Sequence, residues 1–198
     1  RMISREGPRA AVGDVNGDGA EDLFIGGAAG QPGQLYLQTA AGFVPSDRAT
    51  FDPDSTHEDT AVLFFDADGD RDLDLFVGSG GNHQPTGSRQ MQSRLYLNDG
   101  RGHFTISPDA LSVNGYNAAV AVPFDFDADG DTDLFVGSRS TPGAYAVPPR
   151  HFLFQNDGKG RFKDVAKLMA PGLKDLGMAT DALLADVAGD AQPELIVV

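Results

Sequence analysis

The sequence predicts an all-β protein in which a unit of four short antiparallel strands recurs along the chain. Three observations support this prediction. The 198 residues include 25 Gly and 12 Pro, a turn-rich composition that favours many short strands over long helices. A segment with two apolar runs around an acidic loop recurs at similar intervals. A second segment, rich in strand-forming residues, lies between its copies in a constant order.

The first recurring segment is an acidic loop between two apolar runs. Its copies are AVGDVNGDGAEDLFIGG from Ala11, LFFDADGDRDLDLFVGS from Leu63, VPFDFDADGDTDLFVGS from Val122 and LLADVAGDAQPELIVV from Leu183. The first acids of the four copies are Asp14, Asp66, Asp125 and Asp186, at intervals of 52, 59 and 61 residues. Such self-similarity is typical of repeat architectures, in which each copy is one supersecondary unit.

The second recurring segment reads QLYLQTAAGF from Gln34, RLYLNDGRGHF from Arg94 and FLFQNDGKGRF from Phe152. Two of these copies contain Asn-Asp-Gly, at 98–100 and 156–158, which is a tight-turn signal between strands. Because both segments recur in the same order, they belong to one repeated unit.

Each unit is expected to contain four strands. The apolar residues before the first Asp (60–65, for example) form the first strand, and Leu-Phe-Val-Gly after the last Asp forms the second. Leu-Tyr-Leu forms the third, and the tight turn leads to a short fourth strand at Phe104 or Phe162. Four antiparallel strands in about 50 to 60 residues describe one blade of a β-propeller. The single domain 1–198 then holds about three and a half blades and is expected to be part of a longer propeller. The blade repeats span about 8–45, 60–105, 118–163 and, incompletely, 180–198.

These segments resemble FG-GAP/VCBS repeats, the calcium-binding blades of integrin-α-type propellers and of many bacterial exported proteins. The string HEDTAVLFFDADGDRDLDLFVGSGG, followed by RLYLNDGRGHF, is similar to bacterial proteins of the ASPIC/UnbV-associated group. The likeness covers nearly the whole chain. It implies an extracellular or cell-surface protein that functions in binding or cell adhesion.

The acidic loops have the composition of a calcium site. Calcium takes about six to eight oxygen ligands at about 2.3–2.6 Å. Carboxylates at loop positions 1, 3 and 5 can turn inward around one ion, and a backbone carbonyl at position 7 and a carboxylate at position 9 complete the shell. Gly at position 6 permits the sharp turn. The predicted ligands are Asp14, Asn16, Asp18, Ala20 and Asp22 in the first loop, Asp66, Asp68, Asp70, Asp72 and Asp74 in the second, and Asp125, Asp127, Asp129, Asp131 and Asp133 in the third.

Two loops depart from this pattern. In the second loop Arg71 stands where Gly is expected, and a non-Gly residue at positive φ costs about 1 kcal/mol. The fourth loop keeps Asp186 and Asp190, but position 3 is Ala188 and position 9 is Glu194. We therefore expect about three calcium sites and a fourth that is weak or empty.

Two alternatives to a calcium-binding propeller loop share features of these segments. An EF-hand shares the opening spacing but needs Glu at position 12, where this chain has Ile25, Val77 and Val136. The flanking residues also predict strands and not helices, so an EF-hand is excluded. Acidic turns that are solvated without an ion are the remaining alternative. A calcium ion that rigidifies a blade is favoured over one that takes part in chemistry.

The charge distribution narrows the classes of partner. The formal net charge is −14, and 17 of the 29 Asp and Glu residues lie in the four acidic loops. Such crowding is unfavourable unless a cation neutralises it. Without a basic stripe, nucleic acid is not an expected partner. The chain has no Cys, no apolar run long enough for a membrane helix, no Gly-x-Ser-x-Gly motif and no phosphate loop.

Antiparallel strands distribute the loops over two faces. The connections between strands 1 and 2 and between strands 3 and 4 share one face, so the acidic loops and the tight turns lie together. The long connections fall on the opposite face, at 79–93 and 138–150 within blades and at 44–59, 105–118 and 163–180 between blades. Because binding residues concentrate on long loops of a rigid scaffold, a protein or glycan partner is expected on this long-loop face.

The long loops carry many polar side chains but no recognisable catalytic set. These side chains are His57, Glu58, Asp59, Asn82, His83, Arg89, Tyr116, Asn117, Arg139, Tyr145 and Arg150. The run 57–59 could act as an acid/base group, but a role in ordering its loop is favoured. His103 and His151 flank strands and are expected at the surface. The stretch 163–176 has apolar residues at near-helical spacing and predicts a short helix or turn on the propeller edge.

The preferred interpretation is a non-enzymatic, calcium-stabilised propeller segment that binds a protein or glycan. The alternative is the propeller part of a calcium-dependent polysaccharide-degrading enzyme. The absence of Trp mildly disfavours sugar stacking, and no acid/base pair can be assigned. The open sheet edges of an incomplete ring also predict self-association.

Overall fold

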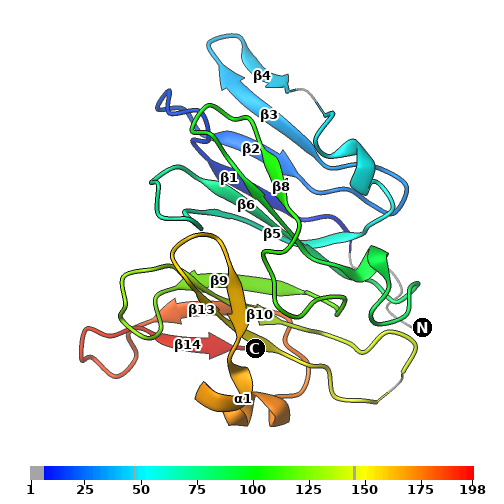
Figure 1. Cartoon of the computed structure of the whole chain (residues 1–198), viewed down its shortest axis with the longest axis vertical. Coiled ribbons are helices and arrows are strands. Elements are labelled where there is room, and N and C mark those ends of the chain that lie inside the picture. Colours follow the sequence, from blue (N-terminus) through cyan, green and yellow to red (C-terminus); the bar gives the residue numbers. More distant parts are fainter. Residues whose placement is uncertain (1–6, 47, 145) are drawn as a thin grey trace.

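The computed structural model describes residues 7–46, 48–144 and 146–198. In this part of the chain, three four-stranded antiparallel sheets are followed by one two-stranded sheet (Figure 1). Blade 1 comprises β1 (Ala10–Gly13), β2 (Asp22–Ile25), β3 (Gln34–Thr39) and β4 (Gly42–Pro45). Blade 2 comprises β5 (Asp59–Phe65), β6 (Asp74–Ser79), β7 (Arg94–Leu97) and β8 (Thr105–Ser107). Blade 3 comprises β9 (Val120–Phe124), β10 (Asp133–Gly137), β11 (Phe152–Asn156) and β12 (Phe162–Asp164). Half-blade 4 comprises β13 (Ala182–Ala185) and β14 (Glu194–Val197).

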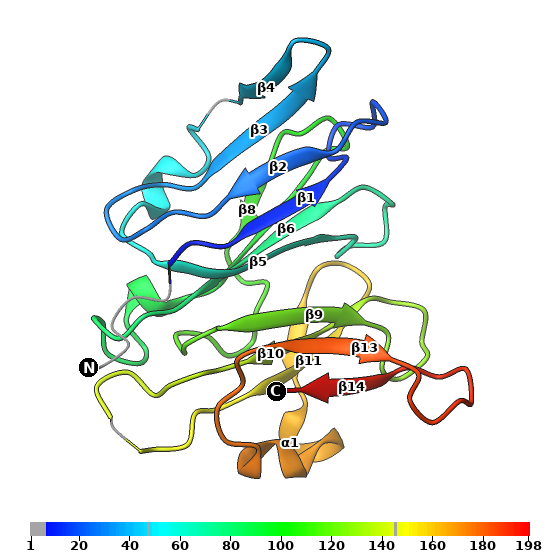
Figure 2. The same ribbon diagram turned by 180° about the vertical axis from the view of Figure 1, so that it is seen from behind.

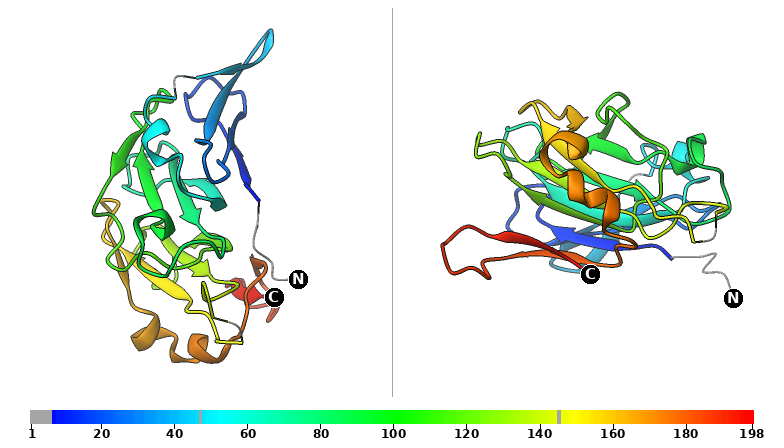
Figure 3. Two further views of the ribbon diagram at one scale, coloured as in Figure 1. Left: turned by 90° about the vertical axis from the view of Figure 1, so that its right-hand side faces the viewer. Right: turned by 90° about the horizontal axis from the view of Figure 1, so that it is seen from below.

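Within each sheet the strands pair in chain order, so each blade is a simple antiparallel meander. The blades follow one another in an arc (Figure 3). Their first strands lie side by side, because β1 contacts β5, β5 contacts β9 and β9 contacts β13 (Figure 2). In a propeller the blades surround a central channel in this way. The predicted fold class, an all-β protein with the architecture of a partial β-propeller, is therefore confirmed.

The apolar core lies between neighbouring blades. In blade 2, Leu75 and Tyr96 pack with blade 1, whereas Phe76 and Leu95 pack with blade 3. All four side chains are at most 1% exposed. Period-2 alternation along each strand produces this arrangement, since successive residues point to opposite faces of the sheet. Burying a side chain of this size stabilises the fold by about 1.5–3 kcal/mol, so packing between blades holds the arc together.

The first and last sheets each have a face that no other described sheet covers. In blade 1, Val12 is 57% and Ile25 is 40% exposed. The strand register places these residues where blade 2 has Phe64 and Val77, which pack in the core between blades 1 and 2. In half-blade 4, Leu183 is 50% exposed. The same sequence pattern is therefore buried inside the arc and exposed at its ends.

Short helices occupy the connections on one side of the arc. They are η1 (Asp52–Asp54), η2 (Arg89–Met91), α1 (Ala166–Met169) and η3 (Pro171–Asp175). The short helix predicted in the stretch 163–176 is present as α1 and η3, and α1 contacts β11 of blade 3 (Figure 1). No helix in the described residues is long and apolar enough to cross a membrane.

The structure differs from the expected positions of Phe104 and His151. The fourth strand of blade 2 begins at Thr105, and Phe104 instead packs in the core between blades 1 and 2 at 6% exposure. His151 was expected at the surface but is only 4% exposed. Its Nδ1 accepts the backbone N–H of Ser138 and its Nε2 lies 2.8 Å from the carbonyl oxygen of Gly177. Both polar ring atoms are satisfied by the backbone of neighbouring loops, which allows the ring to be buried.

Candidate functional site

The four acidic loops share one backbone conformation, which the carboxylate at position 1 organises. In the first loop, Asp14 accepts hydrogen bonds from the backbone N–H groups of Gly17 and Gly19, both at 2.8 Å. The bond from Gly19 is the main cause that lowers the pKa of Asp14. In the fourth loop, Asp186 accepts N–H groups at the same positions, from Gly189 and Ala191. In the second loop, Asp66 accepts the N–H groups of Gly69 and Arg71. In the third loop, Asp125 accepts the N–H of Gly130.

Each loop turns sharply at two positions with positive φ. Position 6 has φ 85° at Gly19 and 77° at Arg71, which confirms the strain expected at Arg71. Position 4 also has positive φ, as at Gly69 (82°) and Ala128 (61°), and the sequence analysis missed it. The signal was present, since three of the four copies have Gly at position 4. The left-handed conformation of Arg71 and Ala128 is disfavoured by about 1–2 kcal/mol each, and the hydrogen bonds within the loop offset this cost.

In blades 1 to 3, the carboxylate at position 9 joins the acidic loop to the third strand. Asp74 is fully buried, and it accepts the N–H of Ala67 in the loop and that of Asn98 at the end of β7, both at 2.8 Å. Asp22 and Asp133 are also fully buried and make the corresponding pairs of bonds. Burial raises the pKa of Asp74 to about 7 and that of Asp133 to about 6. An ionised carboxylate at this depth favours a nearby positive charge.

Loops 2 and 3 each bring three carboxylates together. Ligand oxygens of Asp66, Asp68 and Asp74 lie within 4.8 Å of one another. The same is true of Asp125, Asp127 and Asp133. Two oxygens on opposite sides of one calcium ion would be about 4.6–5.2 Å apart, so each triad has the dimensions of a single site.

Position 5 lies outside both triads and has a different partner. Asp70 accepts the N–H of Asp72 at 3.0 Å, and Asp129 accepts that of Asp131 at 2.9 Å. The first loop has the amide of Asn16 at position 3, and the fourth has Ala188, which offers no ligand atom.

The second loop contains carboxylate oxygens without a hydrogen-bond partner. Oδ1 of Asp68 and Oδ1 of Asp72 are buried and accept no hydrogen bond. Burial and then the charge of Asp70 raise the pKa of both groups, to about 6 at Asp72. Crowded carboxylates with free lone pairs, and no nitrogen or sulfur donors among them, suit a hard divalent cation. The residues present therefore fit a metal ion of the calcium type.

A buried asparagine connects the acidic loops of successive blades. Nδ2 of Asn98 donates to the carbonyl oxygens of Val15 in loop 1 (2.8 Å) and Leu73 in loop 2 (3.1 Å). Asn156 bridges loops 2 and 3 in the same way, through the carbonyl oxygens of Ala67 and Thr132. Both asparagines begin the Asn-Asp-Gly turns. The turns and the acidic loops thus share one face of the arc, as predicted from strand order.

On the opposite face, the run 57–59 orders its loop. His57 is 2% exposed, and its ring nitrogens each lie 2.9 Å from a backbone carbonyl oxygen, those of Asp54 and Arg89. Burial and the charge of Arg94 lower the pKa of His57. Asp59 forms a buried ion pair with Arg94 and accepts the N–H of Gly27. These groups hold loops of blades 1 and 2 together and form no acid/base pair open to a substrate.

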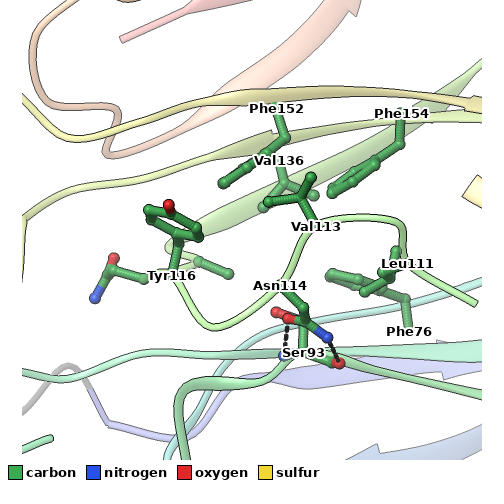
Figure 4. A pocket seen from close by; sticks show the side chains of 11 residues that line it. Phe76, Ser93, Leu111, Val113, Asn114, Tyr116, Val136, Phe152 and Phe154 are labelled. Carbon is green, nitrogen blue, oxygen red and sulfur yellow. Dashed lines mark hydrogen bonds between the residues drawn. The ribbon is translucent and has the colours of Figure 1, made fainter. Parts of the chain in front are cut away.

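The long-loop face between blades 2 and 3 contains two pockets. The smaller, under Tyr116 and between the apolar side chains of Phe76 and Phe152, has about 10 Å³ (Figure 4). That volume holds about one water, so this pocket is a packing defect between blades. The larger holds about 190 Å³ and is lined by Tyr116, Asn117 and Arg150, among others.

The remaining candidate residues of this face are dispersed. His83 and Arg89 are exposed, whereas Arg139 is partly buried. His103 is also exposed, but it lies in the turn between β7 and β8 on the face of the acidic loops. Tyr145 lies outside the described residues.

The match to a family model agrees with this architecture. The family model of the FG-GAP-like repeat matches residues 14–77 and 80–136. No curated protein sequence matches the chain. Among solved structures, an Agrocybe aegerita lectin that recognises non-reducing terminal N-acetylglucosamine matches with 20% sequence identity and a TM-score of 0.46. The match covers 79% of this chain but 37% of the lectin chain, so this chain spans little more than a third of that protein's length. Because the two matched ranges include more than half of the residues and contain three of the acidic loops, the chain belongs to the FG-GAP-like repeat family.

Proposed function

We propose that this protein is a calcium-stabilised binding module, in which the acidic loops bind calcium and the long-loop face binds a protein or glycan. The observation that supports the calcium sites best is the pair of carboxylate triads in loops 2 and 3, each organised around a fully buried position-9 aspartate. The first loop has the same conformation with an amide oxygen at position 3. These three loops are the proposed sites, and the fourth is weak because Ala188 supplies no ligand.

The proposed role of the ion is structural. The acidic loops contact the tight turns and are joined across blades by Asn98 and Asn156. A cation there would neutralise the crowded carboxylates and hold successive blades in register. The long-loop face lies at the other end of the strands, which leaves it available for a partner. Because the ion stabilises the scaffold and lies far from the long-loop face, calcium is expected to change the stability of the protein more than its affinity for a partner.

Calcium titration of metal-stripped protein by calorimetry, with a melt at each end point, tests this proposal. About three sites and a clear rise in the melting temperature are expected. Calcium at about 100 times the Kd of a site adds about 2.7 kcal/mol of stability for that site. Absence of binding would overturn the proposal.

A single-charge variant makes the test specific to the loops. Asp68→Asn removes a carboxylate whose Oδ1 has no hydrogen-bond partner, and it relieves repulsion from Asp66 and Asp70. The metal-free variant should melt at or above the wild-type temperature, while calcium should raise its melting temperature less. The matched control is Asp157→Asn, which changes an exposed turn carboxylate outside the triads and should leave the calcium effect unchanged. An undiminished calcium effect in Asp68→Asn would contradict the assignment of loop 2.

We further propose an extracellular or cell-surface location and a relation to the bacterial ASPIC/UnbV-associated proteins. Calcium sites in extracellular modules typically have Kd values of about 10⁻⁴–10⁻³ M, which requires the calcium concentration found outside cells. Some carboxylates of the loops, such as Asp18 and Asp70, are exposed, which agrees with affinities in this range. Affinities tighter by several orders of magnitude would argue against this location.

A further inference from the structure

We infer that the larger pocket on the long-loop face binds a sugar that carries a carboxylate, such as a uronic acid at the end or within an acidic glycan. This inference rests on the proposed function in taking the long-loop face as the binding face. The pocket holds about 190 Å³ and lies where loops 79–93, 107–119 and 138–151 of blades 2 and 3 meet. Its wall includes Thr86, Tyr116, Asn117, Ser138, Ser140 and Arg150.

Buried hydrogen bonds fix the three loops around this pocket. Asn117 is 1% exposed, and its side chain accepts the N–H of Arg139 and donates to the carbonyl oxygen of Gly81. The hydroxyl of Ser138 lies within hydrogen-bond distance of the carbonyl oxygens of Asn117 and Arg150 and can donate to either one. The N–H of Gly87 donates to the carbonyl oxygen of Gly115 at 2.7 Å, which sets Thr86 beside Tyr116. A pocket whose wall is held by the scaffold in this way needs little ordering when a ligand binds.

The charged side chain in the pocket wall is opposite in sign to the net charge of the chain. The formal net charge of the protein is −14, yet Arg150 in the pocket wall is a cation, and one of its nitrogens is paired with Asp164. No acidic side chain lines the pocket. A cation in a pocket wall that contains no acid favours a negatively charged ligand there.

Arg150 is positioned to recognise that negative charge. Its guanidinium carbon lies 5.3 Å from the ring centroid of Tyr116 and 4.8 Å from that of Phe152. One of its nitrogens donates to Asp164 at 2.6 Å, and the side chain remains 44% exposed. The rings and the ion pair hold the planar group in place, while its other N–H groups remain available. A guanidinium binds a carboxylate through two parallel hydrogen bonds, so a carboxylate is the expected charged group.

The size and the hydroxyl groups of the pocket favour a sugar as the carrier of the carboxylate. One water needs about 10–15 Å³ by the same measure, so the pocket has room for about a dozen non-hydrogen atoms, the size of one hexose. Oγ of Ser140 is buried without a hydrogen-bond partner, and Thr86 is exposed at the rim. An unpaired hydroxyl can donate to and accept from a ligand hydroxyl, which a sugar ring supplies on several sides.

The test uses sodium glucuronate and glucose, which differ at one carbon in carrying or lacking a carboxylate. Each is titrated by calorimetry or NMR into the calcium-loaded protein at constant ionic strength. Glucuronate should bind with a Kd in the millimolar range and at least about tenfold more tightly than glucose, since a tenfold difference corresponds to one net charge-assisted contact. Equal binding of the two sugars, or no binding of glucuronate, would overturn the inference.

Variants and other anions make the assignment specific. Arg150→Gln should weaken glucuronate binding at least tenfold, and Arg150→Lys should weaken it less because the charge is kept but the planar fork is lost. The matched control is Arg161→Gln, which removes an exposed arginine from the turn between β11 and β12 on the opposite face. Unchanged binding in a folded Arg150→Gln variant would contradict the pocket. Inorganic phosphate or an acidic tripeptide that binds as tightly as glucuronate would overturn the choice of a sugar.

The outcome can be separated from that of the proposed function. A calcium-induced rise in melting temperature without glucuronate binding overturns this inference alone. Glucuronate binding that Arg150→Gln abolishes, in a protein whose stability does not respond to calcium, overturns the calcium sites alone.

Discussion

At the scale of single residues, Asn98 connects blades 1 and 2, which are separate repeats in the sequence. Its Nδ2 donates to the carbonyl oxygens of Val15 and Leu73, which belong to the acidic loops of two blades. Its Oδ1 accepts the N–H groups of Asp99 and Gly102 in its own turn. One amide side chain thus satisfies backbone groups in three segments.

Removing this amide should destabilise the protein. Asn98→Ala leaves buried backbone groups without partners, at about 1–3 kcal/mol for each, so we expect the free energy of unfolding to fall by about 2–4 kcal/mol. Urea denaturation at saturating calcium measures the change. The matched control is Gln38→Ala. Gln38 is exposed in β3 and holds the position in blade 1 that Asn98 holds in blade 2, so the free energy of unfolding should change by no more than about 0.5 kcal/mol. Equal effects of the two substitutions would show that the bridge between blades contributes nothing.

Asp74 predicts a dependence of stability on pH in the metal-free protein. Its pKa is raised to about 7 in the folded state, against about 3.9 for an unfolded chain. Between these values the folded state binds more protons than the unfolded state. The contribution of this group to stability is therefore fully present below about pH 4 and is lost as the pH rises through about 7.

Comparison of the wild type with Asp74→Asn isolates this contribution, because His57 and His151 titrate in both proteins. Metal-free wild type should lose stability relative to Asp74→Asn as the pH rises from 5 to 8. Melting temperatures at several pH values in the presence of a chelator measure the difference. A difference that stays constant over this range would mean that Asp74 titrates normally.

At the scale of elements, the long loops around the larger pocket pack backbone against backbone. A Cβ atom at Gly115 would lie 2.8 Å from Cα of Gly87, closer than real Cβ contacts. Gly143 has a similar positive φ, 74° against 86°, but a Cβ there would meet nothing within 4 Å. Both glycines therefore have a backbone conformation that favours glycine, but only Gly115 lacks space for a Cβ atom.

Alanine at the two positions separates these effects. Gly143→Ala should cost about 1 kcal/mol for positive φ alone. Gly115→Ala should cost about 1–3 kcal/mol more, because overpacking forces the two loops apart. Urea denaturation of both variants measures the difference, and glucuronate affinity should fall in Gly115→Ala alone. Equal destabilisation by the two substitutions would mean that the loops separate without cost.

At the scale of the whole molecule, the two ends of the arc are open. Val12 and Ile25 of blade 1 and Leu183 of half-blade 4 are exposed at positions whose equivalents are covered inside the arc. The two open faces differ from each other, so contact between copies would be head-to-tail. We propose that the chain as given associates in solution through these ends.

Sedimentation velocity over a range of protein concentrations tests the association. Average mass should rise with concentration, and Ile25→Lys should reduce the rise because it places a charge in the contact. Ile106→Lys is the matched control, since Ile106 is 42% exposed on the outer strand of blade 2, against 40% for Ile25. A monomer at all concentrations, or equal effects of the two lysines, would exclude association through this face.

Much of the architecture could be predicted from the sequence because it depends on local patterns that recur. The aspartates of the acidic loops make hydrogen bonds within three to seven residues, so their spacing alone predicts the loops. The continuous run of strand-forming residues around Leu75 and Phe76 predicts a strand. The Asn-Asp-Gly turns predict hairpins. Even Arg71, which breaks the glycine pattern, keeps the positive φ that its place in the loop requires.

The tertiary structure decided what depends on residues far apart in the chain. Asn98 meets Val15 across 83 residues and Asn156 meets Ala67 across 89, and no local signal distinguishes these asparagines from ordinary turn residues. His151 is buried because loops of blade 3 supply partners for both ring nitrogens. The pocket at Arg150 exists only where three loops meet. The sequence by itself determined the repeat, its strands and its acidic loops, since hydrogen bonds and side-chain alternation act over a few residues. The tertiary structure alone decided the links between blades and the pocket on the long-loop face, because packing brings together segments whose patterns are independent.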